Sequence, residues 1–273
     1  IMLTVCMLAT SLTLPIFAVD SWSPTETTRI YVATDSGAVD VNDRSDEVML
    51  HAHRFAQEYR SKLGEQLVVA YGAKENAHYC DIILEYDPDL GMAKESFSLN
   101  VYRDNLIITA SDTAGLFYGY REVLKQLLVD NTVDEALDNK PAVAERALSL
   151  DNGRKYFSPE WIKGLICEMA WAGMITLVVH SSEEMGLGLE SKTYPWLAGR
   201  DGSLCVQAYL TDSDHENFDK YLTQEELRDI AEFAKMYHVQ LVPSFDSPGH
   251  LNYIVKCFNT SVRQKGSYSF TYN

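Results

Sequence analysis

The sequence has little positive charge. It contains 23 Lys and Arg residues against 39 Asp and Glu residues, which gives a formal net charge of −16 at neutral pH. Because nucleic acids and anionic membrane surfaces are bound through basic patches, this balance argues against both as partners. It favours a neutral or cationic ligand.

Cysteine is also scarce. The chain of 273 residues has five, and the four that follow the N-terminal segment are not paired at the spacing of metal ligands. The sequence therefore calls for no metal and no organic cofactor. Cys167 falls on the apolar face of a predicted helix and is expected in the core. The other three give no indication of a disulfide pairing; they are Cys80, Cys205 and Cys257.

Only the first 19 residues form a long uncharged apolar run. This segment, "IMLTVCMLATSLTLPIFAV", ends in small residues and leads into polar sequence. It is typical of the apolar core and cleavage region of a signal peptide, with Ala18 as the expected cleavage position. The chain is therefore expected to be secreted or displayed at the cell surface. The alternative is a retained membrane anchor of marginal length.

A small α+β domain is predicted over residues 28–138. Strand-like segments rich in β-branched and aromatic residues lie at 29–34, 81–87, 97–104 and 106–112. A helix is expected from a cap at Ser45 to a stop at Gly64, and a second over 112–128. Residues 129–146 are polar, contain Pro141 and are interpreted as a linker.

From residue 145 to 273 strands alternate with helices. Apolar strands are predicted at 147–151, 175–179 and 239–245, with helices beginning after Ser158 and Thr223. Repeated βα units indicate a parallel sheet, as a doubly wound fold or a (β/α)8 barrel. The first strand is followed by "DNGRKYF" rather than by a glycine-rich turn, which argues against a dinucleotide-binding fold.

Ionisable residues follow each of these strands, as they do in barrel active sites. Each has a structural alternative: Arg154 could simply pair with Asp151, a histidine at a strand end is often a rim residue, and adjacent acids often edge a loop. Asp246 and His250 form the strongest candidate pair, since an acid beside an imidazole fixes its tautomer, with a simple connecting turn as the alternative. The further candidates are His180, Glu183 and Glu184.

The loop over 180–222 is long for a βα connection, and such loops are usually functional. It contains Tyr194, Trp196, Tyr209 and Phe218, whose faces suit the stacking of sugar rings.

Three segments together resemble the catalytic barrel of glycoside hydrolase family 20, the β-N-acetylhexosaminidases: "ALSLDNGRKYFSPEWIKGLI", "HSSEEMGLGLESKTYP" and "YLTQEELRDIAEFAKMYHVQLVPSFDSPGH". "TAGLFYGYREVLKQLL" is similar to the last helix of the small domain that precedes that barrel. The resemblance covers residues 28 to about 255 and implies an α/β fold. In this fold a small α+β domain precedes, along the chain, the first three strands of an incomplete (β/α)8 TIM barrel.

The resemblance also implies a mechanism in which the 2-acetamido oxygen of the substrate is the nucleophile, an exception to the two-carboxylate scheme. Arg154 matches the arginine that binds sugar hydroxyls, and His180 matches the second histidine of a His-x-His segment. Glu183 occupies a place usually held by Asp. Asp246 and His250 match residues that support the catalytic acid.

The chain departs from the family pattern at three positions. Val178 replaces the first histidine of the His-x-His segment, Ser244 stands where many members have Glu, and Glu183 is longer than the usual Asp. The Asp-Glu pair at the end of the fourth barrel strand is expected beyond Asn273. The chain is therefore expected to be an inactive fragment of a longer enzyme.

Three functions remain open. The first is a secreted enzyme that acts on terminal β-linked N-acetylhexosamine in oligosaccharides or glycoconjugates, with a disaccharide-releasing lacto-N-biosidase as a close variant. The second is a non-catalytic carbohydrate-binding protein on a degenerate barrel. The third is a different barrel hydrolase.

Overall fold

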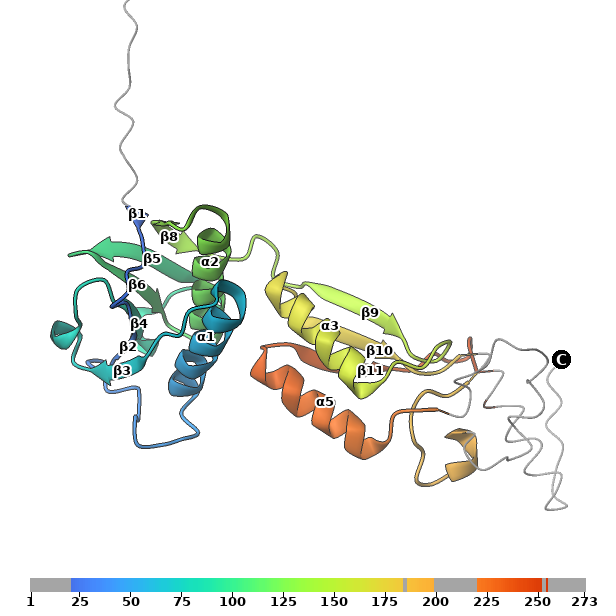
Figure 1. Cartoon of the computed structure of the whole chain (residues 1–273). Coiled ribbons are helices and arrows are strands. Elements are labelled where there is room, and N and C mark those ends of the chain that lie inside the picture. The colour runs from blue at the N-terminus through green and yellow to red at the C-terminus, as the bar shows by residue number, and fades with distance from the viewer. Residues whose placement is uncertain (1–20, 184–185, 199–219, 252–253, 255–273) are drawn as a thin grey trace, which may run out of the picture. The chain divides into compact units, whose positions relative to one another are not determined.

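The computed structural model describes residues 21–183, 186–198, 220–251 and 254 (Figure 1). The chain divides into two compact units, residues 1–141 and 142–273. The predicted signal peptide, Cys205, Cys257, Tyr209, Phe218 and Glu184 lie outside the described residues. Among the described residues, no helix is both long enough and apolar enough to cross a membrane.

The first unit is built on a six-stranded mixed sheet with the order β3-β2-β4-β6-β5-β8. The first four strands in this order run parallel, and β5 runs antiparallel to both of its neighbours. A separate short ladder joins β1 to β7. The strands are β1 (Ser21–Trp22), β2 (Ile30–Ala33), β3 (Val69–Gly72), β4 (Ile82–Tyr86), β5 (Phe97–Tyr102), β6 (Asn105–Ala110), β7 (Val133–Asp134) and β8 (Ala136–Asn139).

Two helices, α1 (Glu47–Leu63) and α2 (Thr113–Asp130), lie side by side against one face of this sheet (Figure 1). Asp46, not the predicted Ser45, caps α1, because its Oδ1 accepts a hydrogen bond from the backbone N–H of Met49 at 3.0 Å. Ser45 instead donates to Asp43. Gly64 ends α1 in the left-handed conformation, as predicted.

The core of the first unit lies between the sheet and these helices. Alternate strand residues face the helices, and Gly119 of α2 lets Ile108 of β6 approach closely, since a Cβ there would lie 2.5 Å from its Cγ2. The apolar face predicted for α2 is buried as expected; it consists of Leu116, Tyr120, Val123, Leu124 and Leu127. The opposite face of the sheet carries a smaller cluster around Tyr31, Ile83 and Ile107.

The interpretation of residues 129–146 as a linker is wrong in part. Both β7 and β8 fall within it, and β8 extends the sheet by pairing with β5. The cause is that β8 is an edge strand whose residues are half-buried or exposed, so its sequence "ALDN" lacks the alternation that marks a strand. Strand β3, also at an edge and only partly buried, was missed for the same reason.

The second unit contains a parallel sheet of three strands with the order β11-β10-β9. These strands are β9 (Ala147–Asp151), β10 (Thr176–His180) and β11 (Gln240–Ser244). The connecting helices are α3 (Pro159–Trp171) and α5 (Gln224–Met236), with a 3-10 turn at Pro195–Ala198. Each strand lies beside its predecessor in the chain, without the reversal of order that defines a doubly wound sheet.

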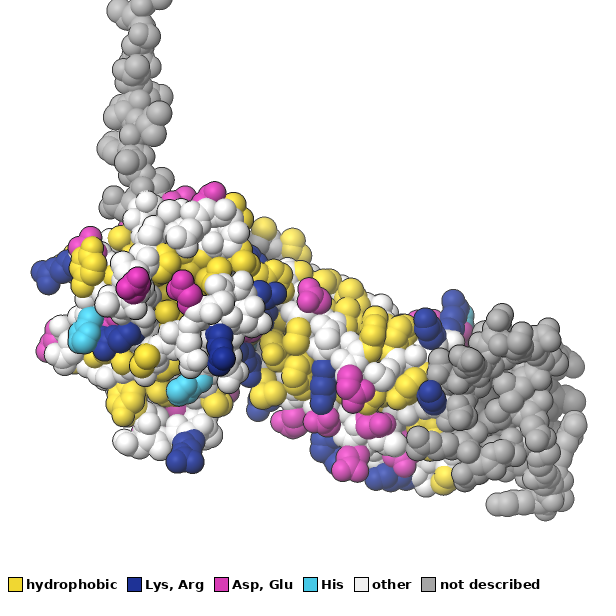
Figure 2. Space-filling view, viewed as in Figure 1, with side chains coloured by type: hydrophobic (Ala, Val, Ile, Leu, Met, Phe, Trp, Pro, Cys, Tyr) yellow, Lys and Arg dark blue, Asp and Glu magenta, His cyan; other side chains and the backbone are white. Residues whose placement is uncertain are grey.

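Both helices of the second unit begin where the sequence predicts. Ser158 accepts a hydrogen bond from the N–H of Trp161, and Pro159 occupies the first helical position. Thr223 and Glu226 form a reciprocal capping box at the start of α5. On the face of this unit seen in Figure 2, charged side chains of both signs are interspersed with apolar ones.

Strand β10 is not buried on both faces, although its continuous apolar sequence is typical of a strand that is. Leu177 and Val179 are fully buried, whereas Thr176, Val178 and His180 are half-buried. Because side chains alternate across a strand, His180 lies on the face opposite to that of Leu177 and Val179.

Candidate functional site

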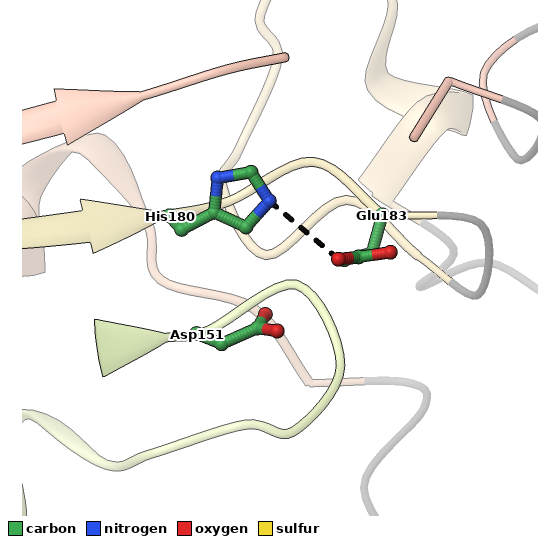
Figure 3. Close-up of side chains that lie close together, drawn as sticks. All are labelled: Asp151, His180 and Glu183. Atoms are coloured by element: carbon green, nitrogen blue, oxygen red, sulfur yellow. Dashed lines mark ion pairs between the residues drawn. The ribbon is translucent and has the colours of Figure 1, made fainter. Parts of the chain in front are cut away.

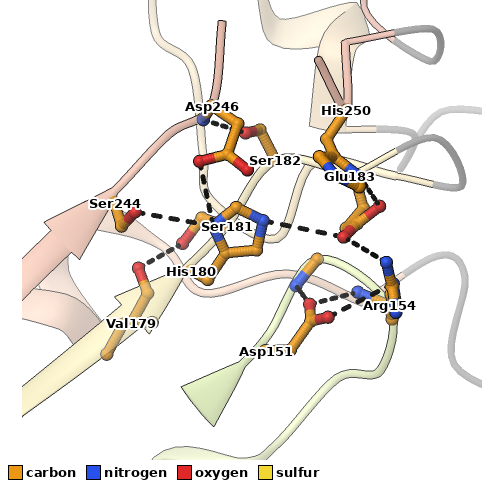
Figure 4. A network of polar contacts seen from close by, with 11 residues as sticks. Asp151, Arg154, Val179, His180, Ser181, Ser182, Glu183, Ser244, Asp246 and His250 are labelled. Carbon is orange, nitrogen blue, oxygen red and sulfur yellow. Dashed lines mark hydrogen bonds and ion pairs between the residues drawn. The ribbon is translucent and has the colours of Figure 1, made fainter. Parts of the chain in front are cut away.

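The polar residues predicted for the site come together at the carboxyl ends of the three parallel strands (Figure 4). The ladder register places Asp151, His180 and Ser244 side by side as the last residues of β9, β10 and β11. Because the register is parallel and unshifted, the loops after the three strands leave the sheet at one edge.

A tight turn after β9 positions Arg154. The N–H groups of Asn152 and Gly153 both donate to the carbonyl of His180, at 2.7 and 3.1 Å. Asp151 Oδ1 accepts from the N–H groups of Gly153 and Arg154, which closes the turn. A Cβ at position 153 would lie 3.1 Å from the Glu183 side chain, so glycine leaves the space that Glu183 fills.

Glu183 is the centre of the network. Its side chain is only 5% exposed, and its two oxygens are shared between two partners from other strand ends. Arg154 Nη2 lies 2.8 Å from Oε1, and His250 Nδ1 donates to Oε2 at 2.9 Å. His180 Nε2 lies 3.7 Å from Oε1. A buried carboxylate needs such partners, since removing a charge from water costs several kcal/mol.

Arg154 links the first strand end to the second. Its Nε lies 3.3 Å from Asp151 Oδ2 while its Nη2 contacts Glu183. The sequence left open whether Arg154 is a site residue or only a partner of Asp151. The structure contains the ion pair between Arg154 and Asp151 together with the contact between Arg154 and Glu183. The Arg154 side chain remains 58% exposed, so its guanidinium can also donate to a ligand at this edge.

The predicted pairing of Asp246 with His250 is not what the structure contains. His250 is held by Glu183, as described above, and Asp246 lies towards a different histidine, with Oδ1 3.9 Å from His180 Nδ1. The backbone N–H of Asp246 donates to Ser182 Oγ at 3.0 Å. His250 itself has a left-handed φ of 54°, and its ring lies beside Glu183 rather than beside Asp246 (Figure 4).

Two buried polar residues of the site were missed by the sequence analysis. Ser182 is fully buried and anchors the loop after β11 through the bond from Asp246. Asn152 is buried, donates to the carbonyl of Gly188 at 2.9 Å and accepts from the N–H of Phe157. Neither belongs to a residue type that signals ionisable chemistry, although the Asn-Gly pair after an apolar strand does signal a tight turn.

Asp151, His180 and Glu183 offer ligand atoms within 4.8 Å of one another, a spacing that a metal ion could use (Figure 3). However, Arg154 forms ion pairs with both carboxylates. A guanidinium therefore already supplies the positive charge that two neighbouring acids require, and the grouping is explained as an ion-pair network.

The long loop after β10 is only partly described. Isolated β-bridges pair Ser182 with Leu187 and Leu189 with Leu222. These two bridges hold the ends of the loop near the strand ends. Of the four aromatic residues noted in this loop, Tyr194 is 46% exposed. The described cysteines are Cys80, which is buried, and Cys167 on α3, which is half-buried; both are free thiols.

Comparison with known proteins accounts for both units. Residues 144–272 match the model of the glycosyl hydrolase family 20 catalytic domain, and residues 18–139 match the model of domain 2 of the same family. A beta-hexosaminidase of Porphyromonas gingivalis is 25% identical over 217 residues, which is 76% of this chain and 27% of that protein. A chitooligosaccharidolytic beta-N-acetylglucosaminidase of Ostrinia furnacalis is 27% identical over 70% of this chain and 31% of that protein.

The fold is shared with solved structures of the same family. The GH20 beta-N-acetylhexosaminidase of Streptomyces coelicolor aligns over 93% of this chain and 49% of its own, with a TM-score of 0.68 and 24% identity. The chain spans about a quarter of the length of the curated relatives it matches first. With both of its units matched by models of one family, the chain belongs to glycosyl hydrolase family 20.

Proposed function

We propose that the whole protein is a β-N-acetylhexosaminidase that removes terminal β-linked N-acetylhexosamine from oligosaccharides or glycoconjugates. The observation that carries this proposal is the network of Arg154, Glu183 and His250 at one strand edge in a chain of family 20. We further propose that its three parallel strands are the first three of a (β/α)8 barrel. Their sequential order and the fold shared with solved family members support this.

Each residue of the network has a proposed role. The Arg154 side chain is 58% exposed at the strand ends, so we propose that its guanidinium binds the hydroxyl groups of the terminal sugar. Glu183 positions Arg154 and His250 through its two carboxylate oxygens. Because His250 donates to Glu183 from Nδ1, its Nε2 is the nitrogen left to accept a proton or a hydrogen bond from a catalytic acid.

Asp246 and His180 complete the supporting arrangement. Their side chains lie 3.9 Å apart, and His180 Nδ1 lies 3.5 Å from Ser244 Oγ. We propose that they shape the edge of the sugar pocket rather than take part in proton transfer.

The proposed chemistry is substrate-assisted. The 2-acetamido oxygen attacks the anomeric carbon while a carboxylic acid protonates the leaving oxygen, and water then opens the intermediate with retention. Residues 145–273 contain no adjacent Asp-Glu pair of the kind that the family resemblance implies. We therefore propose that another part of the whole protein supplies it and that residues 1–273 alone do not catalyse hydrolysis.

The test compares two substrates with the whole protein. Nitrophenol should be released from the 4-nitrophenyl N-acetyl-β-glucosaminide but not from the matched β-glucoside, because the glucoside has no acetamido oxygen to act as nucleophile. The 273-residue chain should release nitrophenol from neither. Equal turnover of the two substrates by the whole protein would contradict the proposed mechanism.

A second candidate is a carbohydrate-binding protein without catalysis. It is favoured by two departures from the family pattern, Val178 for the first histidine and Ser244 beside His180. The same assay separates the candidates: a whole protein that binds N-acetylglucosamine oligosaccharides but hydrolyses neither substrate is the binding protein.

Export is proposed on the composition of residues 1–19 alone. Residues 1–27 fused to a reporter enzyme should direct the reporter out of the cell and be cut near Ala18. A reporter that stays inside, or that keeps the segment, would contradict this.

A further inference from the structure

A cleft lies in the first unit, on the face of the sheet opposite to α1 and α2. Its volume is about 570 Å³, within the range of small-molecule sites. Its floor is the smaller apolar cluster, with Ile83 of β4 and Ile107 of β6. Segment 74–79 forms one wall, and the turn between β5 and β6 forms the other.

Two tyrosines at this cleft expose much of their side chains. Tyr79 on the first wall is 65% exposed, and Tyr102 at the end of β5 is 54% exposed. The turn after Tyr102 is tight, with left-handed φ values at Arg103 and Asp104, and the Arg103 guanidinium lies 5.1 Å from the Tyr102 ring. A tyrosine face offers a large contact area at a small cost in side-chain entropy.

Three of the charged residues that line the cleft, Asp35, Lys74 and Glu85, have hydrogen-bond or ion-pair partners. Lys74 Nζ lies 2.8 Å from Glu85 Oε1, and Thr109 donates to Glu85 Oε2 at 2.9 Å. Asp35 accepts from the backbone N–H of Lys74 at 2.7 Å. Because these charges already have partners and the whole chain carries −16, an anionic ligand is not favoured.

Neutral polar groups lie beside the tyrosines. Asn105 is in register with Tyr102 and keeps its side-chain NH2 group for a ligand, since its Oδ1 accepts from the N–H of Asp81. Asn100 of β5 is exposed and in register with Ile107, so it lies on the same face of the sheet. Exposed aromatic faces with amide and hydroxyl groups between them suit a sugar, which has apolar C–H faces and a polar rim.

We propose that this cleft is a second carbohydrate-binding site, separate from the strand-end network, that holds a neutral oligosaccharide against Tyr79 and Tyr102. The site goes beyond the proposed hydrolysis, because it contains none of the residues assigned to it. Only the choice of N-acetylglucosamine as the sugar unit rests on the proposed function. Such a site would retain a polymeric or surface-bound glycan on the protein between catalytic events.

The experiment is a calorimetric titration of the 273-residue chain carrying Arg154→Ala with the neutral trisaccharide of β-1,4-linked N-acetylglucosamine. The Arg154→Ala background weakens binding at the strand-end network and isolates the cleft of the first unit. Addition of Tyr79→Ala or Tyr102→Ala should each weaken the remaining binding by about three- to tenfold, the size of one aromatic contact.

The matched control is Tyr71→Ala. Tyr71 is 54% exposed like Tyr102, but it lies in β3 in register with Val32, on the other face of the sheet from Tyr31. It should leave binding unchanged, and Tyr102→Phe, which keeps the ring, should retain most of it. No binding in the Arg154→Ala background, or equal binding in the Tyr79→Ala, Tyr102→Ala and Tyr71→Ala chains, would overturn the proposal.

The outcome is independent of the hydrolysis assay. If the trisaccharide does not bind in a tyrosine-dependent way, the second site is overturned. The whole protein can still release nitrophenol in that case, so the proposed hydrolysis stands. Conversely, tyrosine-dependent binding would support the second site even in a protein without hydrolase activity.

Discussion

At the scale of single residues, the extra methylene of Glu183 decides how the site is connected. The resemblance placed an Asp at this position and left the reach of the longer Glu undetermined. In the structure the Glu183 carboxylate reaches two loops at once, with 2.8 Å to Arg154 and 2.9 Å to His250. Arg154 and His250, which are proposed to bind the sugar and to face the catalytic acid, are thus held by one carboxylate.

Glu183→Asp should therefore impair the whole enzyme although it restores the usual family residue. The carboxylate would be drawn back by one carbon, so one of the two contacts would lengthen. Turnover of the N-acetylglucosaminide should fall about 10- to 100-fold, as expected for a displacement near 1 Å. Glu232→Asp, on the exposed face of α5, is the control and should be neutral. Equal activity of Glu183→Asp and the parent would show that the shared carboxylate is unimportant.

Tyr59 provides a pH prediction for the core of the first unit. Burial raises the pKa of Tyr59 to about 12, above the value near 10 expected for the unfolded chain. The folded state therefore keeps its proton where the unfolded state has lost it. The resulting stability is present below about pH 10 and is lost as pH rises towards 12.

The loss of stability is measured as the change with pH in the denaturant concentration at which half of the chain is unfolded. Between pH 10 and 12 the midpoint should fall less steeply in Tyr59→Phe than in the parent, because phenylalanine has no proton to lose. The exposed Tyr71→Phe should follow the parent curve. Identical slopes for Tyr59→Phe and the parent would exclude Tyr59 as a source of the loss.

At the scale of elements, the second unit was the more predictable part of the fold. Its three apolar strands and the Ser158 and Thr223 caps were all predicted from local pattern, because a buried strand and a helix cap depend on few neighbouring residues. Edge strands β3 and β8 were missed, since pairing with a neighbour, rather than burial, holds them in place.

The capping box of α5 gives an element-scale prediction. Thr223 Oγ1 accepts from the N–H of Glu226 at 3.1 Å, and Glu226 Oε2 accepts from the N–H of Thr223 at 2.8 Å. Thr223→Ala should lower the free energy of unfolding by about 1 kcal/mol, measured by urea denaturation. Thr223→Ser keeps the acceptor oxygen and should lose little. If alanine and serine are equally stable, the cap does not stabilise α5.

At the scale of the whole molecule, the sequence located the site but did not determine its pairing. Five of the six candidates, Arg154, His180, Glu183, Asp246 and His250, gather at one strand edge because the parallel register aligns the ends of β9, β10 and β11. The sixth, Glu184, lies outside the described residues. The partner of His250 depends on the path of the turn before it and on the space that Gly153 leaves for Glu183. Neither is encoded in residue spacing alone.

Each of the two units carries one proposed sugar-binding site. The second unit carries the network proposed to bind the terminal sugar, and the first carries the proposed tyrosine cleft. Both sites are suited to neutral sugars, in agreement with the acidic composition of the chain.

The most direct test of the central claim is the turnover of the 4-nitrophenyl N-acetyl-β-glucosaminide by the whole protein carrying Arg154→Ala. Arg228→Ala, on the exposed face of α5, is the matched control. If Arg154 binds the terminal sugar, its removal should reduce kcat/KM by at least about 100-fold, the loss of a charged hydrogen-bond donor, while Arg228→Ala stays near the parent value. Equal kcat/KM for the two variants would contradict the assignment of the strand-end network as the substrate site.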